Sequence, residues 1–300
     1  MDDLARTSES CVRVFTPAKV NLHLGVHTEL DERRYHRADS VMAALALYDE
    51  VFVRQADTLS VTVEPGVGVP AERSNVGKAV LLLAEALGVE PLVDVHVWRE
   101  IPMRAGLGGS SSDAGGTLRA LCALWGVAVD DPRVVSVARR IGADVPFFLN
   151  PQPSYLAGAG DVLQESYADL PAQPVVLVKP KDGVSTVEAY ADFDRDPPGR
   201  GDLEGMLMAL RAGDMNRVLA LLANNLDPVA RRLLPEDEAA KKWLLAQEGV
   251  ITALVTGSGS CIFAPCRTHE AAQQIAADAE KRGWWSYVTS FAAPRKVEVC

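Results

Sequence analysis

The sequence feature that most constrains the fold is a stretch rich in glycine and serine, residues 106–116. Valines alternate with polar residues over 93–98, which is typical of a strand. Apolar side chains recur at helical spacing over 117–125. Glycines let backbone N–H groups approach a ligand closely, and the start of a helix favours an anion through its free N–H groups. The order strand, loop, helix therefore predicts a phosphate-binding site.

The spacing of the glycines in this stretch differs from that of two common phosphate-binding motifs. It is not a Walker A loop, because no Gly-Lys-Ser/Thr closes it. Gly106 and Gly108 fit the dinucleotide fingerprint, but its third glycine would fall at Ser111. The plain alternative is a glycine-rich helix start that binds no ligand. The density of glycine and serine between a strand and a helix favours a phosphate-binding loop instead. Among the serine hydroxyls, Ser111 is the candidate metal ligand.

Composition narrows the class of protein. Three hundred residues, 48% of them hydrophobic and 23% charged, predict a globular protein of one large domain or two modest ones. The net charge of −10 argues against a nucleic-acid or membrane-surface partner, and no apolar run is long enough to span a bilayer. The acidic N-terminus lacks the apolar core of a signal peptide. We expect a cytoplasmic monomer or weak homodimer acting on a small molecule.

The five cysteines are odd in number and lack metal-ligand spacing. They predict small core residues in a reducing cytoplasm, with Cys300 as an exposed exception.

Periodicity, caps and turn residues predict the remaining elements. Strands are expected over 11–25 with a break near Pro17, over 49–63 in two runs, and over 175–178, 254–263 and 287–291. Helices are expected over 75–87 with Asn75 as cap, and over 131–141, from 186 onwards, 203–222, 235–247 and 268–282. Residues 28–37 are expected as a charged loop, and the glycines at 158 and 160 mark a domain boundary near residue 160.

Two further parts of the sequence carry residues that could take part in catalysis. Lys19 and Asn21 share one face of a predicted strand, although a solvated face is the ordinary interpretation of a lone lysine. Asp144 is the lone carboxylate of the apolar segment 142–149. A buried carboxylate is costly unless it is paired, so Asp144 is either a cap, a structural ion pair or a catalytic carboxylate beside a cation.

The segment from Pro102 through Gly106 to Ala114 resembles the phosphate loop of the GHMP kinases. Residues 16–22 and 256–260 resemble the first and third motifs of that superfamily. The Ser-Ser-Asp-Ala ending of the loop, Tyr35-His36 and residues 142–147 are most similar to the 4-diphosphocytidyl-2-C-methyl-D-erythritol kinase family. The departures are Arg34 and Ser110 in place of glycines, and Met42 in place of an aromatic residue.

The resemblance implies a two-domain α+β fold. Residues 1–160 would form a ribosomal-S5-like, ATP-binding domain, and residues 161–300 an α/β-plait domain on the substrate side, with the active site between them. Lys19 and Asp144 would be catalytic, and their pairing would keep Asp144 ionised. The ATP site would comprise Asn75, Pro102, Gly106, Leu107, Gly108, Gly109, Ser110, Ser111 and Ser112. The acceptor site would comprise Asn21, Tyr35, His36, Thr186, Tyr190, Gly257, Ser258 and Gly259.

Plain structural roles stay open for several of these residues: capping for Asn75, solvent exposure for His36 and helix packing for Tyr190. The resemblance implies ATP and Mg²⁺ as cofactors and phosphorylation of the 2-hydroxyl of 4-diphosphocytidyl-2-C-methyl-D-erythritol. Arg34 and Met42 leave room for another GHMP kinase of the homoserine or mevalonate type. A non-catalytic ligand sensor on the same fold is the other alternative, against which the intact Lys19 and Asp144 speak.

Overall fold

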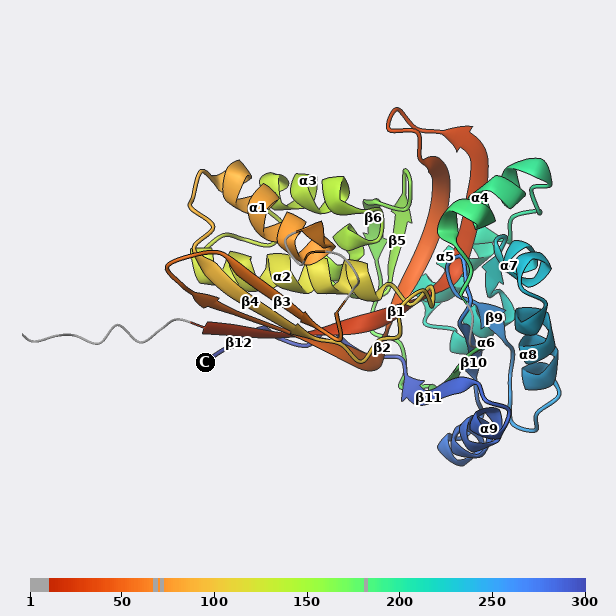
Figure 1. Cartoon of the computed structure of the whole chain (residues 1–300). Helices are drawn as coiled ribbons and strands as arrows, with labels where there is room; N and C mark the ends of the chain where they lie inside the picture. The colour runs from red at the N-terminus through yellow and green to blue at the C-terminus, as the bar shows by residue number, and fades with distance from the viewer. Residues whose placement is uncertain (1–10, 67–69, 71–72, 181–182) are drawn as a thin grey trace, which may run out of the picture.

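The computed structural model describes residues 11–66, 70, 73–180 and 183–300. The N-terminal segment, which we expect not to be a signal peptide, lies outside the described residues. The chain forms two sheets, each covered by helices, and the long strands β1 and β2 run from one half of the molecule into the other (Figure 1). This mixture of sheets and helices agrees with the predicted α+β class. Among the described residues no helix is long and apolar enough to cross a membrane.

The larger sheet has the strand order β12-β1-β2-β4-β3. These strands are β1 (Cys11–Leu30), β2 (His36–Gln55), β3 (Ser60–Glu64), β4 (Val93–Trp98) and β12 (Glu298–Val299). The break in alternation near Pro17 is a register shift between Pro17 and Ala18 within one continuous strand. The expected loop over 28–37 is shorter than predicted, because backbone pairing closes the β1–β2 hairpin and leaves only a turn near residues 31–35.

Helices α1 (Asn75–Leu87), α2 (Gly109–Trp125) and α3 (Pro132–Ile141) cover one face of this sheet (Figure 1). Their apolar stripes bury Val76, Val80 and Leu118 against the strands. The prediction that Asn75 caps α1 is wrong, because Ser74 is the N-cap and its hydroxyl accepts from the N–H of Gly77. The amide of Asn75 is therefore available for another contact.

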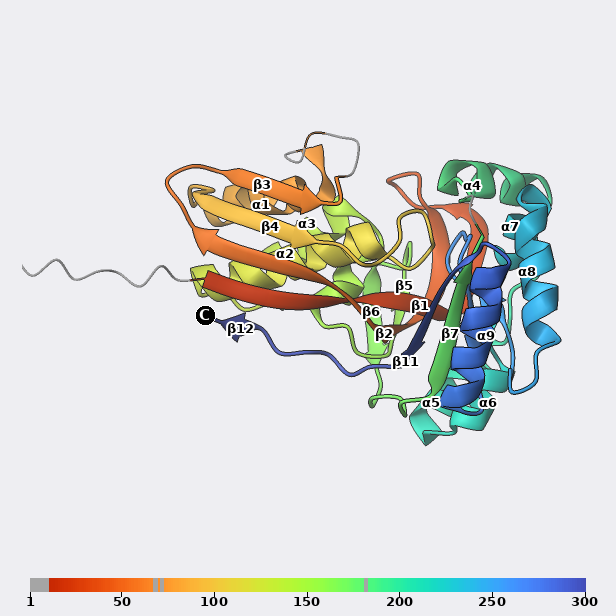
Figure 2. The ribbon, with the colours of Figure 1, turned by 60° about the horizontal axis from the view of Figure 1, so that its bottom comes forward.

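The smaller sheet has the antiparallel order β11-β7-β10-β9. Its strands are β7 (Pro174–Lys179), β9 (Leu254–Val255), β10 (Ile262–Pro265) and β11 (Trp285–Ser290). Helix α9 (His269–Lys281) lies along β7 (Figure 2). The other helices of this half are α4 (Thr186–Arg195), α5 (Leu203–Ala212), α6 (Met215–Ala220), α7 (Asp227–Leu233) and α8 (Pro235–Leu245).

Two features of this half differ from the sequence prediction. The helix expected over 203–222 is two helices, because Gly213 adopts a left-handed conformation and Asp214 caps a new helix. Helix α7 was not expected, since it is too short to show a full apolar period.

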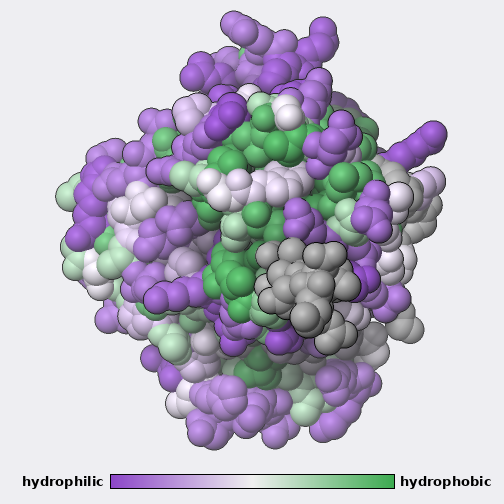
Figure 3. Space-filling model, turned by 90° about the vertical axis from the view of Figure 1, so that its left-hand side faces the viewer, coloured by the Kyte–Doolittle hydropathy of each residue, from purple (hydrophilic) through white to green (hydrophobic). Residues whose placement is uncertain are grey.

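Three further short strands belong to the larger sheet. β5 (Ser154–Ala157) pairs with β2 and β6 (Val162–Ser166), while β8 (Ala223–Asn224) runs parallel to β1. The larger sheet therefore includes strands from both sides of residue 160, and a domain boundary at that position stays a prediction. At the end of the molecule that faces left in Figure 1, hydrophilic residues are interspersed with hydrophobic ones, which is ordinary for a protein surface (Figure 3).

The cysteine prediction is wrong about the pairing of two of the five residues, although Cys300 is exposed as expected. Cys11 and Cys300 form a disulfide with Cα atoms 5.3 Å apart, because β12 pairs with β1 and brings the two strand ends together. Their separation of 289 residues gives no local sequence signal for the bond. Cys122, Cys261 and Cys266 are unpaired and buried, as expected of small core residues.

Gly115 provides a test of the packing between α2 and the 3₁₀ turn Val145–Leu149. A Cβ atom at Gly115 would lie 2.3 Å from Cβ of Phe148 and 3.2 Å from its backbone carbon. We expect Gly115→Ala to lower the free energy of unfolding by about 1–3 kcal/mol, the usual cost of overpacking. Chemical denaturation measures this change.

Gly199→Ala is the matched control, because a Cβ atom there meets nothing within 4 Å. Equal stability of the two variants would contradict the described packing of α2.

Candidate active site

The glycine-rich stretch forms the connection between β4 and α2 and borders a cavity of about 460 Å³. Gly108 is the N-cap of α2, with φ of 76°, and its carbonyl accepts from the N–H groups of Ser111 and Ser112. The cavity is lined by Asn75, Arg99, Ile101, residues 102–111 and Thr186, among others. The amide of Asn75 donates to the Ser110 hydroxyl at 3.2 Å. The structure thus brings Asn75 to the loop and to the border of this cavity, and its expected place near the adenine stays a prediction.

Ser112 is the exception among the predicted ATP-site residues. Its side chain is buried, donates to the carbonyl of Pro17 at 2.6 Å and contacts the Thr16 hydroxyl at 2.6 Å. It does not border the cavity. Ser112 instead anchors α2 to β1.

The loop packs so closely on its surroundings that two positions exclude any side chain. A Cβ atom at Gly106 would lie 2.0 Å from the carbonyl oxygen of Thr256. A Cβ atom at Gly108 would lie 2.9 Å from Cγ of Lys19 and from Cζ of Phe148, and both glycines have positive φ. The backbone N–H of Lys19 also donates to the carbonyl of Leu107 at 2.9 Å. The absence of side chains therefore lets the loop touch β1.

Lys19 joins the phosphate loop to the candidate catalytic carboxylate. Its side chain is buried, and its Nζ lies 2.7 Å from Oδ1 of Asn21 and 3.4 Å from Oδ2 of Asp144. Asp144 is less buried than we expected, with its side chain 35% exposed, because it borders a cavity rather than the core. A carboxylate that is paired with one cation and still partly exposed can accept a hydrogen bond from a ligand in the cavity.

Asp144 borders a second, smaller cavity of about 100 Å³. Its other lining residues include Lys19, Asn21, Ser40, Thr186, Tyr190, Gly257 and Ser258. Thr186 borders both cavities, and its hydroxyl lies 3.2 Å from that of Ser258. Burial, with a smaller contribution from the charge of Asp144, raises the pKa of Tyr190 to about 12, so its hydroxyl stays neutral. The two cavities thus have the side chain of Thr186 as a common border, and the ion pair lines the smaller one.

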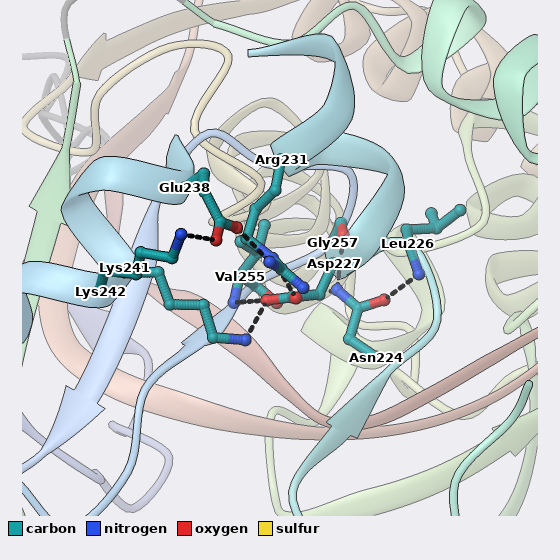
Figure 4. A network of polar contacts seen from close by, with 9 residues as sticks. All are labelled: Asn224, Leu226, Asp227, Arg231, Glu238, Lys241, Lys242, Val255 and Gly257. Carbon is teal, nitrogen blue, oxygen red and sulfur yellow. Dashed lines mark hydrogen bonds and ion pairs between the residues drawn. The ribbon is translucent and has the colours of Figure 1, made fainter. Parts of the chain in front are cut away.

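The loop over 257–259 is held by contacts from both halves of the chain. The N–H of Gly257 donates to Oδ1 of Asn21 at 3.0 Å, and the Thr256 hydroxyl to the carbonyl of Gly106 at 3.3 Å. The amide of Asn224 donates at 2.8 Å to the carbonyls of Val255 and Gly257 (Figure 4).

Asp227 fixes the strand that leads into this loop. Its carboxylate accepts from the N–H of Val255 at 3.0 Å, from Lys241 at 2.8 Å and from Arg231 at 2.8 Å (Figure 4). Sequence reasoning missed Asn224 and Asp227, because neither lies in a recognised motif. Their one signal is a run of polar residues, Asn224, Asn225 and Asp227, between apolar positions.

Of the three residues expected at the cytidine, the structure brings two together. The rings of His36 and Tyr190 have centroids 5.0 Å apart, and Nδ1 of His36 lies 2.8 Å from the carbonyl of His27. The side chain of Tyr35 is exposed, stacks under the guanidinium of Arg33 and borders neither cavity. Arg34 has φ of 66°, the left-handed conformation that glycine favours. The hairpin turn therefore adopts a backbone suited to glycine although it carries arginine.

The residues at the loop could bind magnesium only together with phosphate oxygens, which would supply most of the ligands. The described ranges contain no group of three His, Cys, Asp or Glu side chains that could form a metal cage. Magnesium in phosphotransferases is held largely by substrate phosphates and water, with one or two protein ligands. The hydroxyl of Ser111, at the border of the larger cavity, suits that single-ligand role.

Comparisons with known proteins agree with this geometry. The model of the GHMP kinases N terminal domain matches residues 74–151, and that of the GHMP kinases C terminal matches residues 206–283. The 4-diphosphocytidyl-2-C-methyl-D-erythritol kinase of Desulfitobacterium hafniense is 34% identical over 283 residues, covering 93% of this chain and 95% of the relative. That of Nocardia farcinica is 36% identical over 285 residues, covering 90% and 89%.

Solved structures show the same relationship. A crystal structure of 4-(cytidine 5'-diphospho)-2C-methyl-D-erythritol kinase has a TM-score of 0.75 and 30% identity, covering 93% of this chain and 100% of its own. Homoserine kinase from Cytophaga hutchinsonii also has a TM-score of 0.75, but its 20% identity shows the fold alone. The predicted two-domain fold is thereby confirmed. The chain belongs to the GHMP kinases and, within them, to the family of the 4-diphosphocytidyl-2-C-methyl-D-erythritol kinases.

Proposed function

We propose that this protein transfers the γ-phosphoryl group of ATP to the 2-hydroxyl of 4-diphosphocytidyl-2-C-methyl-D-erythritol, a step in the non-mevalonate synthesis of isoprenoid precursors. The observation that carries the proposal is the Lys19–Asp144 pair, which borders the smaller cavity close to the phosphate loop. A kinase needs this arrangement, because the γ-phosphoryl group and the acceptor hydroxyl must meet in line.

The larger cavity takes ATP. Backbone N–H groups and serine hydroxyls at the start of α2 face anionic phosphate oxygens, and the partial positive charge of the helix start favours them. Asn75, held at Ser110, lies at the border of the same cavity and contacts the nucleotide. Ser111 would hold Mg²⁺ together with the phosphates, and the bound ion would neutralise part of their charge.

Asp144 accepts the proton of the acceptor hydroxyl. The hydroxyl oxygen then forms a bond to the γ-phosphorus, the bond from that phosphorus to the bridging oxygen of ATP breaks, and ADP leaves with the electron pair. Lys19 holds the carboxylate at 3.4 Å and is itself oriented by Asn21 at 2.7 Å. Its positive charge also lies beside the phosphate loop, where negative charge accumulates in the transition state.

His36 and Tyr190 hold the cytosine ring of the acceptor. Their rings already contact each other, and Tyr190 borders the cavity that contains Asp144. An aromatic face stacks on the base. Nε2 of His36, which lies 3.4 Å from Oδ1 of Asp194, is the ring nitrogen that meets the hydrogen-bonding edge of the base, since Nδ1 lies 2.8 Å from the carbonyl of His27. Tyr35, which is exposed on the hairpin turn, contributes to this site only from its rim.

A coupled assay that detects ADP tests the proposal directly. Purified protein is given ATP with the cytidine-diphosphate acceptor, with homoserine or with mevalonate. We expect turnover with the first acceptor alone. Turnover only with another acceptor would assign a different GHMP kinase activity, and ATP binding without turnover on any acceptor would favour a ligand sensor. We also propose a cytoplasmic location and a monomeric or weakly dimeric state, which fractionation and sedimentation measure.

Asp144→Asn removes the proton acceptor and preserves the side-chain shape. We expect kcat to fall by about 10²-fold or more, the usual scale for loss of a general base. Initial rates at saturating ATP and acceptor measure this. Asp130→Asn, at an exposed carboxylate outside both cavities, is the control and should keep wild-type turnover. A kcat within threefold of wild type for Asp144→Asn would exclude Asp144 as the base.

Gly108→Val tests the phosphate loop. Its side chain would overlap Lys19 and Phe148, at a residue whose φ of 76° disfavours branched residues. We expect ATP affinity, measured by calorimetry, to weaken by at least about tenfold, while affinity for the acceptor changes much less. A folded variant with unchanged ATP affinity would show that the loop does not bind the nucleotide.

Tyr190→Ala tests acceptor recognition. The loss of one stacking face is worth about 1–3 kcal/mol, so KM for the acceptor should rise by about 5- to 150-fold while KM for ATP stays nearly unchanged. His36→Ala should in addition reduce the preference for cytidine over uridine diphosphate analogues. Tyr35→Ala, at the exposed position, is the control with a small effect. Wild-type KM and base preference in both test variants would rule out this cytidine pocket.

A further inference from the structure

A further large cavity is lined by helices α2 and α3, the 3₁₀ turn Val145–Leu149 and the hairpin of β5 and β6. Its volume is about 670 Å³, within the usual range of about 300–1,000 Å³ for small-molecule sites. It shares no lining residue with the two cavities of the candidate active site. Most of its lining side chains are apolar, among them Phe147, Leu149, Leu156 and Leu163. The cavity therefore suits a ligand with an apolar body.

One buried cation borders this cavity. Arg119 lies on α2 and is only 6% exposed. Its Nη2 donates to the backbone carbonyl of Arg295 at 2.6 Å, whereas its Nη1 has no hydrogen-bond partner in the described part of the chain. Among the described residues Arg119 also forms no ion pair. A buried charge is costly without a counterion, so this position favours an anion that the chain does not itself supply.

The other charged groups at the cavity indicate how much negative charge the ligand carries. Asp161 is paired with Arg33 at 2.7 Å and with Arg139 at 2.9 Å, so its charge is compensated. Asp130 also borders the cavity, but its side chain is exposed to solvent, which screens its charge. The single unpaired charge of Arg119 thus matches a monoanion. A carboxylate has one charge and a planar shape that fits a guanidinium, whereas a phosphate monoester carries about two charges.

We propose that this cavity binds a small carboxylate with an apolar chain, which lies against the apolar wall while the carboxylate group pairs with Arg119. The site goes beyond the proposed function, because it uses none of the residues of the candidate active site. Pairing requires the guanidinium, whose Nη1 is enclosed in the free protein, to turn toward the cavity. Arg119 was not a candidate in the sequence, because a single arginine on a helix is ordinarily a surface residue.

The cavity lies across one chain segment from the candidate base. Asp144 is the N-cap of the 3₁₀ turn Val145–Leu149, and Pro146 and Phe147 of that turn line the cavity. Gly160 borders the smaller active-site cavity, and the next residue, Asp161, borders this one. A ligand in the cavity therefore contacts the turn that follows Asp144.

Decanoate is the probe, and decanol, which has the same chain without the charge, is its control. Calorimetry on the full chain, without ATP or acceptor, measures both affinities. Wild type should bind decanoate at least about tenfold more tightly than decanol, since a hydrogen bond to a charged group is commonly worth that factor. Arg119→Met keeps an unbranched side chain without the charge, and should bind decanoate no more tightly than decanol.

Leu163 allows a test that leaves the buried arginine in place. Its side chain is 59% exposed at the rim of the cavity, so polar substitutions are tolerated there. Leu163→Asp adds a negative charge, and Leu163→Asn is the neutral control of the same shape. Leu163→Asp should bind decanoate about two- to fivefold more weakly than Leu163→Asn, while both bind decanol equally. This pair of variants decides the question also if Arg119→Met does not fold.

NMR spectroscopy locates the bound carboxylate. The Nε–Hε resonance of Arg119 should shift on addition of decanoate and stay in place on addition of decanol. Equal affinity of wild type for decanoate and decanol, undiminished decanoate binding by a folded Arg119→Met variant, or equal decanoate affinity of the two Leu163 variants would overturn the proposal. Because no ATP or acceptor is present, none of these outcomes depends on the proposed function.

Discussion

The close approach of the phosphate loop to β1 is the constraint on which the site depends. Gly106 and Gly108 have no side chains, so the loop backbone touches Thr256 on one side and Lys19 on the other. That contact brings the buried side chain of Lys19 beside the start of α2. The ammonium group in turn forms an ion pair with Asp144, with Nζ 3.4 Å from Oδ2. The same backbone proximity that shapes the proposed phosphate site therefore also locates the candidate base.

The site contains cationic side chains although the net charge of the whole molecule is negative. The chain carries a net charge of −10, yet its proposed substrates are anions. Two buried cations, Lys19 and Arg99, lie beside the loop, and each is paired with one carboxylate, Asp144 or Asp113. Burying charge is costly unless it is paired, and the pairing holds both cations in position before a ligand arrives.

The 257–259 loop, which borders the smaller cavity, is held by the side chains of Asn224 and Asp227 through hydrogen bonds to the backbone of Val255 and Gly257. That loop reaches back to Asn21 of β1, while β8 adds a parallel strand to the same β1. Phosphoryl transfer depends on positioning, so these contacts matter as much as the groups that touch substrate.

The sequence by itself determined the elements and the residue types of the site. Local spacing predicted the loop, the helices after it and the lone carboxylate of Asp144, because backbone conformation and periodicity are short-range properties. The catalytic roles of Lys19 and Asp144 came instead from the resemblance to the GHMP kinases. Tertiary structure alone decided which distant residues meet. It joined Cys11 to Cys300 and His36 to Tyr190, and it left Tyr35 in solvent. Such contacts follow from strand register and from packing between elements far apart in the chain, neither of which a local pattern records.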